Sequence, residues 1–321
     1  MWRGSNRGAG LTTEHYVLPG TIGVVTVLYN SSAVLPDFLA SMEQQTYDKL
    51  FTYFVDNGSK DDSVKQCGAW GHDCVVIENT TNVGVAEANN QGILAALADG
   101  CDSVLLLNND TVFPPTLIEL LHAQFRDSNC NMVAPKIYYH DRPNVIWCAG
   151  GRFHLLQSYH TEHFGVGKTD TSQYDTPAWV SYVPTCCLLI RRTVFDLVGL
   201  MDSRYFVYSD DADFLYRCQK KKLRVWYLPK AHLWHKVSSL TGSGSEFSDH
   251  YCARNRIYFL RKHLSYGLAL GLYLQSALRS GVAFFTGRIS LSSWKRRRKS
   301  EAEGWAMHNS NYRWEQDARN V

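Results

Sequence analysis

One carboxylate, Asp110, stands directly after the apolar run Ser103–Leu107 and two asparagines. An apolar run that stops at a small polar cluster is typical of a buried strand that reaches the edge of a sheet. Ligands of α/β proteins bind at the carboxyl edge of such sheets. A carboxylate there offers a hard oxygen ligand suited to Mg²⁺ or Mn²⁺. Taken alone, such a carboxylate is more often part of a strand-end turn.

Three further clusters accompany Asp110. The first is Val55–Ser59, which contains Asp56; the second is Ser209–Asp213, with three aspartates; the third is His235. Each cluster lies next to a predicted strand or turn. Four acidic or imidazole clusters in such positions together predict one metal-dependent site.

Size and composition restrict the classes of protein that this chain can belong to. With 321 residues, of which 45% are hydrophobic and 13% aromatic, it can bury one large core, with or without an appendage. The net charge of +3 argues against a general nucleic-acid binder, although Lys295–Lys299 is a basic block. The nine cysteines form no C-x-x-C pair, which indicates free thiols and a reducing compartment. Residues 1–18 contain no apolar core of a secretory signal, so we expect a flexible tail.

Strands and helices alternate in the first third of the chain. Strands are expected at Ile22–Leu28, Phe51–Val55, Cys74–Glu78 and Ser103–Leu107, and helices at Val34–Gln45, Asp61–Trp70 and Val85–Ala98. This alternation predicts a mostly parallel sheet with helices on both faces. A G-x-G-x-x-G motif does not follow the first strand, which argues against a dinucleotide site of that kind.

The pattern is less regular after Asp110. Segment 150–180 is predicted to be mainly loop, and the chain becomes helical from His250. Between them we expect the strands Met132–Tyr139, Val145–Trp147, Val183–Arg191 and Leu223–Leu228, the last ending at Pro229, and a helix at Thr193–Val198.

Eight short motifs follow one another in chain order over roughly residues 22–262. They are Val24–Asn30, Asp56–Ser59, Asn82–Ala86 with Asn89–Gly92, Leu107–Asp110, Leu189–Arg192 with Val198, Gly199 and Asp202, Tyr208–Asp213, Pro229–Ala231 with His235, and Arg254–Asn255. Together these motifs resemble those of the family 2 glycosyltransferases of the GT-A fold, and most strongly the branch that contains rhamnosyl- and galactofuranosyltransferases.

This resemblance implies a Rossmann-like, mostly parallel central sheet flanked by helices. The catalytic domain would span 19–250, with a nucleotide-sugar half at about 19–112 and an acceptor half at about 113–250. Residues 251–321 would form a helical extension with the basic block. The implied activity is inverting, metal-dependent transfer of a sugar, most simply a rhamnose-like one. The donor would be a dTDP-sugar or a UDP-sugar, and the acceptor a glycan or lipid-linked saccharide of cell-surface polysaccharide synthesis.

The resemblance also assigns roles to residues. A divalent metal that bridges the two phosphates would stabilise the leaving group, and a carboxylate would take the proton of the acceptor hydroxyl. Asp110 and His235 would hold Mg²⁺ or Mn²⁺, and Asp211 would be the catalytic base. Asp210, Asp213 and Trp179 would lie on the acceptor side. The nucleotide-sugar would be bound by Tyr29, Asn30, Asp56, Asn82, Gly84, Asn89, Asn90, Asn108, Asn109 and Arg254.

Structural explanations compete with several of these roles. His235 could pack beside Trp234, Asp56 could form an Asx turn, and Asn82 could cap a helix. The chain also departs from the family pattern in three places. It has one carboxylate where Asp-x-Asp is frequent, aspartate at 210 where glutamate is usual, and Thr185 where glycine is common.

Three other functions are weighed against this one. Processive polysaccharide synthases carry Gln-x-x-Arg-Trp and several membrane spans, whereas Ser310 precedes Arg313–Trp314 here. An inactive carbohydrate-binding protein would not need Asp110, Asp211 and His235. A nucleotidyltransferase would need a glycine- and arginine-rich loop after the first strand, where this chain has Tyr29–Ser32.

The segment Leu264–Thr286 is apolar, but Gln275 and Arg279 interrupt it. A buried arginine disfavours a membrane span, while Leu268 and Leu272 allow an apolar face for a helix lying in the interface. With the basic block, this predicts peripheral attachment to an anionic membrane surface, on the cytoplasmic side of the cell membrane. The alternative is a helix pair packed on the catalytic domain, followed by a solvated basic tail.

Overall fold

The computed structural model describes residues 19–308 except 128, 155–159 and 238–244, so the predicted tail 1–18 and Arg313–Trp314 lie outside the described residues. The helices are α1 (Leu35–Glu43), α2 (Ser63–Gly68), α3 (Val85–Ala98), α4 (Leu117–Ala123), η1 (Gln124–Arg126), α5 (Arg192–Val198), α6 (Asp210–Lys220), α7 (Glu246–His263), α8 (Tyr266–Phe285) and α9 (Leu291–Ala306).

The strands are β1 (Ile22–Leu28), β2 (Leu50–Asp56), β3 (Cys74–Glu78), β4 (Ser103–Leu107), β5 (Thr111–Val112), β6 (Met132–Tyr139), β7 (Ile146–Cys148), β8 (Gly151–His154), β9 (His160–His163), β10 (Ala178–Val180), β11 (Cys187–Arg191) and β12 (Val225–His235). Strands β8 and β9 form a separate hairpin. The others form one sheet in the order β10-β12-β6-β11-β4-β1-β2-β3, with β5 on β12 and β7 on β6.

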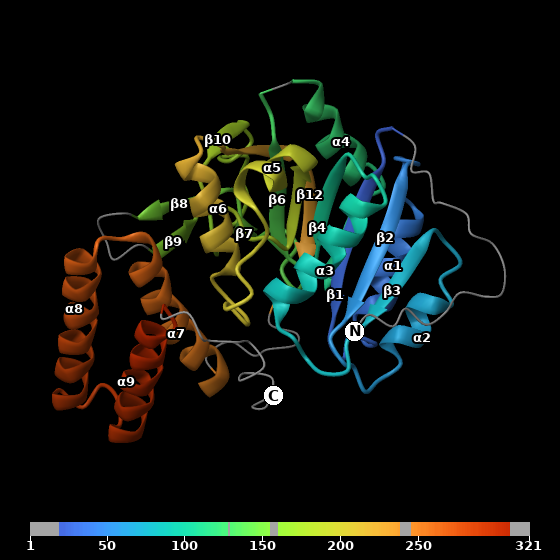
Figure 1. The fold of residues 1–321 in the computed structure, drawn as a ribbon. Helices are drawn as coiled ribbons and strands as arrows, with labels where there is room; N and C mark the ends of the chain where they lie inside the picture. Colours follow the sequence, from blue (N-terminus) through green and yellow to red (C-terminus); the bar gives the residue numbers. More distant parts are fainter. Residues whose placement is uncertain (1–18, 128, 155–159, 238–244, 309–321) are drawn as a thin grey trace.

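Half of this sheet is parallel, as the alternation of strands and helices predicts. Strands β4, β1, β2 and β3 run in one direction, and β11 lies antiparallel between β4 and β6. Helices α1, α2 and α4 cover one face, and α3, α5 and α6 cover the other (Figure 1). The side chains of β4 therefore alternate between two buried clusters: Val104 and Leu106 point to one, Leu105 and Leu107 to the other. Burial on both faces explains the continuous apolar run.

Helix α3 lies very close to the sheet. A Cβ at Gly92 would stand 2.4 Å from a side-chain carbon of Val25, so only glycine allows this approach. Ala86, Ala88 and Ala96 line the same helix without exposed surface. Their small side chains bring the amino end of α3 close to the carboxyl ends of β1 and β2.

One prediction about the second half of the chain is wrong. Strand β12 does not end at Pro229; it continues to His235 through an irregularity between Leu228 and His232. A bulge tolerates proline because the missing N–H leaves no ladder bond unmade. Segment 150–180 lies mostly outside strands within its described part, as predicted, but it also contains the short strands β8, β9 and β10. The acidic cluster Asp210–Asp213 opens the helix α6.

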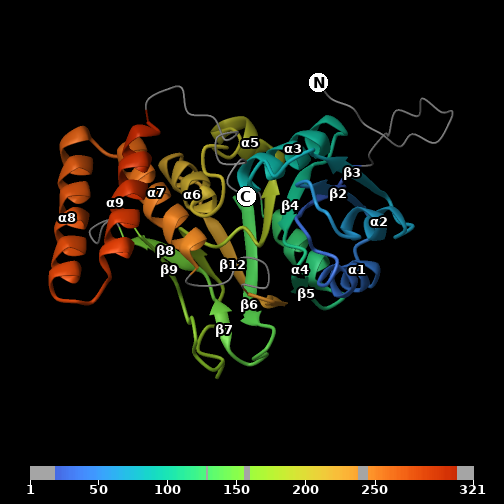
Figure 2. The same ribbon diagram turned by 90° about the horizontal axis from the view of Figure 1, so that it is seen from below.

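The C-terminal helices form a layer at one end of the molecule, with α8 outermost in both views (Figures 1 and 2). Helix α7 begins at Glu246, so the predicted boundary at residue 250 falls inside it. All nine cysteines are free, as expected.

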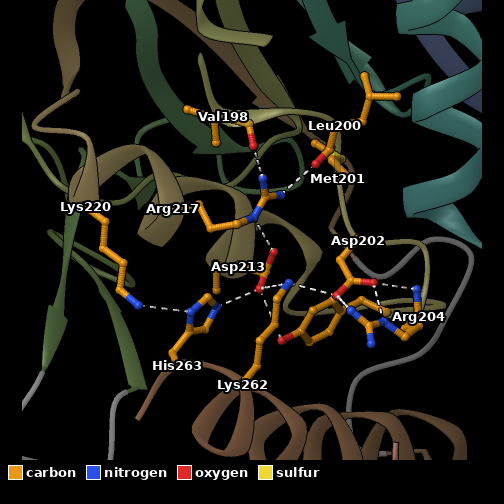
Figure 3. A network of polar contacts seen from close by, with 12 residues as sticks. Val198, Leu200, Met201, Asp202, Arg204, Asp213, Arg217, Lys220, Lys262 and His263 are labelled. Atoms are coloured by element: carbon orange, nitrogen blue, oxygen red, sulfur yellow. Dashed lines mark hydrogen bonds and ion pairs between the residues drawn. The ribbon is translucent and has the colours of Figure 1, made fainter. Parts of the chain in front are cut away.

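Helix α7 is tied to α6 by a buried ion network around Asp213, whose side chain has no exposed surface (Figure 3). The carboxylate contacts Arg217 Nε at 2.8 Å, Lys262 Nζ at 2.6 Å and His263 Nε2 at 2.7 Å. Arg217 also donates to the carbonyls of Val198 and Leu200. Lys262 in turn contacts Asp202 at 2.8 Å. The network thus joins α6, α7 and the segment that follows α5.

Burial alone would raise the pKa of Asp213, but the hydrogen bond from His263 and the charges of Lys262 and Arg217 hold that pKa well below its usual value. The carboxylate has no surface left for an acceptor sugar. The predicted acceptor-side role of Asp213 is therefore replaced by a structural one.

Asp213→Asn should destabilise the protein by about 3–5 kcal/mol, because it removes the counter-charge of the partly buried Arg217 and one of the two carboxylates that contact Lys262. Urea unfolding measures this loss. Asp141→Asn is the matched control, since Asp141 forms an exposed ion pair with Arg142 at 3.6 Å and should change stability by less than about 1 kcal/mol.

The same network predicts a pH dependence. A carboxyl whose folded-state pKa is lowered contributes its full stability above the unfolded value, near 3.8 here, and loses it as the pH falls through the folded value. The stability difference between wild type and Asp213→Asn should therefore shrink below pH 4. A difference that is constant down to about pH 2 would contradict this assignment.

Candidate active site

The candidate site lies at the carboxyl edge of the parallel strands. Leu28 at the end of β1 pairs with Asp56 at the end of β2, and Asp110 follows β4, the other neighbour of β1. Because these strands are parallel, their carboxyl ends meet at one edge of the sheet. The parallel pairing therefore places two of the predicted carboxylates, Asp56 and Asp110, at the same edge of the sheet.

Asp56 is 3% exposed and forms a tight turn with the residues that follow it. Its Oδ2 accepts hydrogen bonds from the N–H groups of Gly58 and Ser59, each at 3.0 Å. Its Oδ1 is buried and has no hydrogen-bond partner among the described residues. One oxygen of Asp56 thus makes the Asx turn, and the other is left for a donor group of a ligand.

Asn30 supports this turn from the end of β1. Its backbone N–H donates to Ser59 Oγ and its Oδ1 accepts from the Lys60 N–H, both at 2.9 Å. Tyr29, the residue before it, is half-buried. Asn30 therefore shapes the Asp56 turn and is itself exposed.

Gly84 begins α3 beside this turn. Asn82 Oδ1 accepts the Gly84 N–H at 2.9 Å, and Val85 N–H donates to the carbonyl of Phe206 at 2.7 Å. A Cβ at Gly84 would stand 2.5 Å from that carbonyl oxygen, and its φ is +86°. Only glycine satisfies both conditions. The predicted nucleotide loop is thus pressed against the segment that leads into α6.

Asp110 and His235 face one another. His235 Nε2 lies 3.0 Å from Asp110 Oδ1, and both residues are more than nine-tenths buried. The pairing of β5 with β12 places Thr111 opposite His235, and the Lys236 N–H donates to the Asp110 carbonyl at 2.8 Å. The extended β12 is therefore what brings residue 235 to residue 110.

The predicted metal fits this pair. One carboxylate and one imidazole are donors that Mn²⁺ and Mg²⁺ accept, and such ions commonly complete their shell with phosphate oxygens and water. His235 Nδ1 is buried and has no hydrogen-bond partner among the described residues. The described residues contain no cluster of three or more metal-binding side chains. Two protein ligands suit a cation that a diphosphate helps to hold.

A series of aromatic contacts runs from this pair to the predicted base. The Trp147 ring lies 4.7 Å from the His235 ring and 5.1 Å from that of His163. His163 in turn lies 5.6 Å from Tyr182, whose hydroxyl donates to Asp211 Oδ2 at 2.7 Å. The metal pair and Asp211 are therefore close neighbours in the fold.

Asp211 is presented by a strained turn. Tyr208 and Ser209 have φ values of 64° and 66°, which non-glycine residues adopt rarely. Asn255 of α7 stabilises the turn by donating to the carbonyls of Val207 and Tyr208 at 2.7 and 2.8 Å. Asp210 and Asp211 follow as the first residues of α6, where the helix dipole favours negative charge.

Burial raises the pKa of both aspartates. Burial, together with the charge of Asp211, raises the pKa of Asp210. Burial also raises the pKa of Asp211, while hydrogen bonds from the Tyr182 hydroxyl and the Ala212 N–H act in the opposite direction. Asp211 keeps part of its surface accessible, whereas Asp210 is buried. A partly accessible carboxylate with raised proton affinity is suited to general base catalysis.

Two predicted nucleotide-binding residues have structural partners instead. Asn109 donates to the Val27 carbonyl and to Ser31 Oγ, and so fastens β4 to β1. Asn90 exchanges two hydrogen bonds of 2.9 Å with the backbone of Met201. Asn89 is 7% exposed, while Asn108 is exposed beside Asp110. The roles of Asn109 and Asn90 are therefore corrected to bracing of the backbone.

Arg254 is also corrected. It is 1% exposed; its Nε donates to Asn255 Oδ1 at 2.9 Å, and its guanidinium lies 4.5 Å from the Tyr251 ring. Such a buried side chain orients Asn255, which holds the turn before α6.

Trp179 lies at the wrong end of the sheet for an acceptor contact. It pairs with Trp226 near the start of β12, nine residues before His235. On the partner strand β6, the positions opposite Trp226 and His235 are Val133 and Tyr139, six residues apart, so at about 3.3 Å per residue they are separated by roughly 20 Å.

Sequence analysis missed Trp147, His163, Tyr182 and Asn255 as parts of the site. No spacing identifies the first three, because β7, β9 and the segment that follows β10 meet only in the folded chain. Asn255 was noted only as part of the Arg254–Asn255 motif.

Comparison with known proteins agrees with this geometry. Residues 23–199 match the family described as Glycosyl transferase family 2. The chain is 26% identical over 300 residues to an N-acetylglucosaminyl-diphospho-decaprenol L-rhamnosyltransferase of Mycobacterium tuberculosis, covering 86% of this chain and 95% of the relative. It is 22% identical over 190 residues to the dTDP-rhamnosyl transferase RfbF of Shigella flexneri, covering 57% and 61%.

Two solved structures share the fold. GalNAc-T7 with UDP, GalNAc and Mn²⁺ superposes with a TM-score of 0.60 at 15% identity over 91% of this chain, which spans 56% of that protein. The mannosyltransferase PcManGT of Pyrobaculum calidifontis with GDP-Man and Mn²⁺ gives 0.55 at 16% identity, covering 90% and 86%.

The protein is a glycosyltransferase of the GT-A fold. Within that class, the chain belongs to glycosyl transferase family 2, as the motifs of its sequence suggested.

Asp211→Asn keeps the size of the side chain but cannot accept a proton. Its rate of sugar transfer should fall by about 10²–10⁴ while donor binding is retained. Asp210→Asn is the matched control and should be milder. If Asp210→Asn is the more damaging change, the register of this assignment is wrong.

Tyr182→Phe removes a hydrogen bond that lowers the pKa of Asp211, so that pKa should rise further. Since the base acts when deprotonated, the acid limb of the rate profile should move to higher pH. Tyr53→Phe on β2 is the control. It removes a hydroxyl that donates to Asp99, and it should leave the pH–rate profile unchanged. A limb that moves to lower pH would contradict the role of Tyr182.

Proposed function

We propose that this enzyme is a metal-dependent, inverting glycosyltransferase that moves a rhamnose-like sugar from a nucleotide-diphosphate donor to a lipid-linked or glycan acceptor. The observation that carries the proposal is the meeting of the Asp110–His235 pair, the Asp211 carboxylate and the unpartnered Asp56 oxygen at one edge of the sheet. These are the groups needed to hold a diphosphate, to deprotonate an acceptor and to bind a nucleoside.

The donor would lie along the carboxyl ends of β1, β2 and β4. Asp56 Oδ1 is placed to accept a hydrogen bond from the base or ribose, beside the loop Asn82–Val85. The similarity to the M. tuberculosis and S. flexneri rhamnosyltransferases supports a dTDP-sugar, with a UDP-sugar as the second choice.

Asp110 and His235 would hold Mn²⁺ or Mg²⁺ against the diphosphate. When bound, the cation supplies positive charge that stabilises the leaving group. The protein contributes the buried position of the Asp110–His235 pair, which strengthens the electrostatic interactions of that pair. The Trp147 ring, which packs on the His235 ring, fixes the orientation of the imidazole.

Asp211 would take the proton of the acceptor hydroxyl as that oxygen attacks the anomeric carbon from the face opposite the leaving diphosphate. Such a single displacement inverts the anomeric configuration. Tyr182 holds the carboxylate by one oxygen, and the turn braced by Asn255 fixes its direction. An acceptor attached to a lipid agrees with the diphospho-decaprenol acceptor in the name of the M. tuberculosis relative.

A processive synthase is less well supported. Within the described residues, only α8 is long and apolar enough to cross a membrane. An inactive sugar-binding protein would have no use for a base of raised pKa beside a metal pair. Release of nucleoside diphosphate across a panel of sugar nucleotides distinguishes both cases from the proposal.

Asp110→Ala should abolish turnover, because it removes the only carboxylate of the metal pair. In wild type, Mn²⁺ with dTDP or UDP at about a hundredfold excess over Kd should stabilise the fold by about 2.7 kcal/mol, and the variant should lose this shift. Asp73→Ala, an exposed aspartate on the same half, is the control. Full activity in excess EDTA would contradict metal dependence.

A further inference from the structure

Helix α8 exposes its apolar face and buries its polar face. Its most exposed large side chains are apolar: Leu274 is 56% exposed, Leu278 70%, Val282 52% and Phe285 87%. Their spacings of four, four and three residues place them on one face of the helix. Both views show α8 as the outermost element at its end of the molecule (Figures 1 and 2). An apolar stripe therefore covers that end.

The face of α8 that points into the protein is the polar one. Ser276 and Ser280 are 4% and 5% exposed. Ser276 Oγ donates to Glu301 Oε1 of α9 at 2.7 Å and accepts from Arg256 of α7 at 3.4 Å. Glu301 is 1% exposed. A soluble surface helix shows the opposite arrangement, with polar residues outward.

The concentration of exposed apolar residues is local. Seven of the eleven large hydrophobic side chains that are exposed in the described part of the chain lie between Tyr266 and Leu291. Contiguous apolar patches of this kind mark interaction sites on soluble proteins.

The charged residues in the segment around the apolar stripe are all basic. Residues 264–300 contain seven Lys or Arg and no Asp or Glu, in a chain whose net charge is only +3. Arg279 and Lys295 are exposed, and Arg288 follows the end of α8. None of these three forms an ion pair in the described residues, whereas Arg297 and Arg298 pair with Glu301. Three cations thus remain beside the apolar stripe.

We propose that the outer face of α8 docks on an anionic phospholipid membrane, with the helix lying in the plane of the interface. Apolar side chains flanked by unpaired basic residues match a bilayer surface, where acyl chains lie beneath anionic headgroups. A protein partner with the same properties would need an acidic rim around an apolar groove. A second copy of this chain would bring the same unpaired basic residues against Arg279, Arg288 and Lys295.

The helix would lie on the bilayer rather than cross it. Its inner face is held to α7 and α9 through Arg256, Ser276 and Glu301, and lipid cannot replace those contacts. The stripe also differs from the expected one: Leu274 and Leu278 are more exposed than Leu272, and Gln275 and Arg279 flank the stripe instead of forming an opposite polar face. Arginine at that position can extend to the headgroups.

Co-sedimentation of the full chain with vesicles tests the proposal. Vesicles with about one third phosphatidylglycerol in phosphatidylcholine should bind the protein, and pure phosphatidylcholine should bind it much more weakly. Arg279→Gln, Arg288→Gln and Lys295→Gln together should weaken binding to the anionic vesicles about a hundredfold, or about fivefold per charge. Leu278→Glu with Phe285→Glu should weaken it at least about tenfold.

Leu94→Glu with Leu197→Glu is the matched control, because these leucines are 53% and 60% exposed on α3 and α5. This variant should bind as wild type does. Equal melting temperatures verify that all variants are folded. Absence of binding by wild type, or unchanged binding of both α8 variants, would overturn the proposal. A wild-type dimer that the α8 variant converts to a monomer in sedimentation velocity would assign the face to a second copy and overturn it too.

The experiment uses neither donor nor acceptor. Its failure would therefore leave the proposed sugar transfer untouched, and loss of activity would leave the membrane proposal untouched.

Discussion

The buried carboxylate of Asp213 is the interaction on which the catalytic half of this protein depends. It lies in α6, two residues after Asp211, and its ion pairs reach Arg217 of the same helix and Lys262 of α7. A buried charge without partners would be costly, so the three groups can be accommodated only together. The predicted base, Asp211, is therefore held in position through Asp213, whose side chain has no exposed surface. The helical extension is for the same reason part of the catalytic fold.

The two halves of the site are joined by backbone contacts that tolerate little change. Phe206, in the segment before α6, accepts the N–H of Val85 and leaves no space for a side chain at Gly84. The Tyr251 ring of α7 stacks on the Phe206 ring at 5.4 Å. A movement of α7 would consequently displace the predicted nucleotide loop as well as Asp211. The structure thus accounts for glycine at position 84 by steric exclusion, without reference to any ligand.

The sequence was sufficient for the parallel half of the sheet and for the positions of Asp56 and Asp110, because buried parallel strands are continuous apolar runs and their ends meet at one edge. The sequence was insufficient where a side chain could point either into the protein or into solvent. Asn108 and Asn109 are neighbours of the same type, yet only the second turns inward to β1. Trp179 and His235 depend on strand pairing at opposite ends of β12, which no local pattern encodes. The Tyr182–Asp211 contact spans 29 residues, with β11 and α5 between the two positions, so it too required the fold.

Helix α8 shows why amphipathic spacing alone does not decide which face a helix buries. Its serines and its leucines are both helically spaced, and only the partners on α7 and α9, Arg256 and Glu301, determine that the serines point inward. Helix α7 then has two functions. One side packs against the α8–α9 layer through His250 and Arg256, and the other holds the base-bearing turn through Asn255. A membrane beneath α8 would therefore be connected to Asp211 by a single well-packed helix. That helix would fix the distance between the lipid surface and the base, which is the geometry that transfer to a lipid-linked acceptor requires.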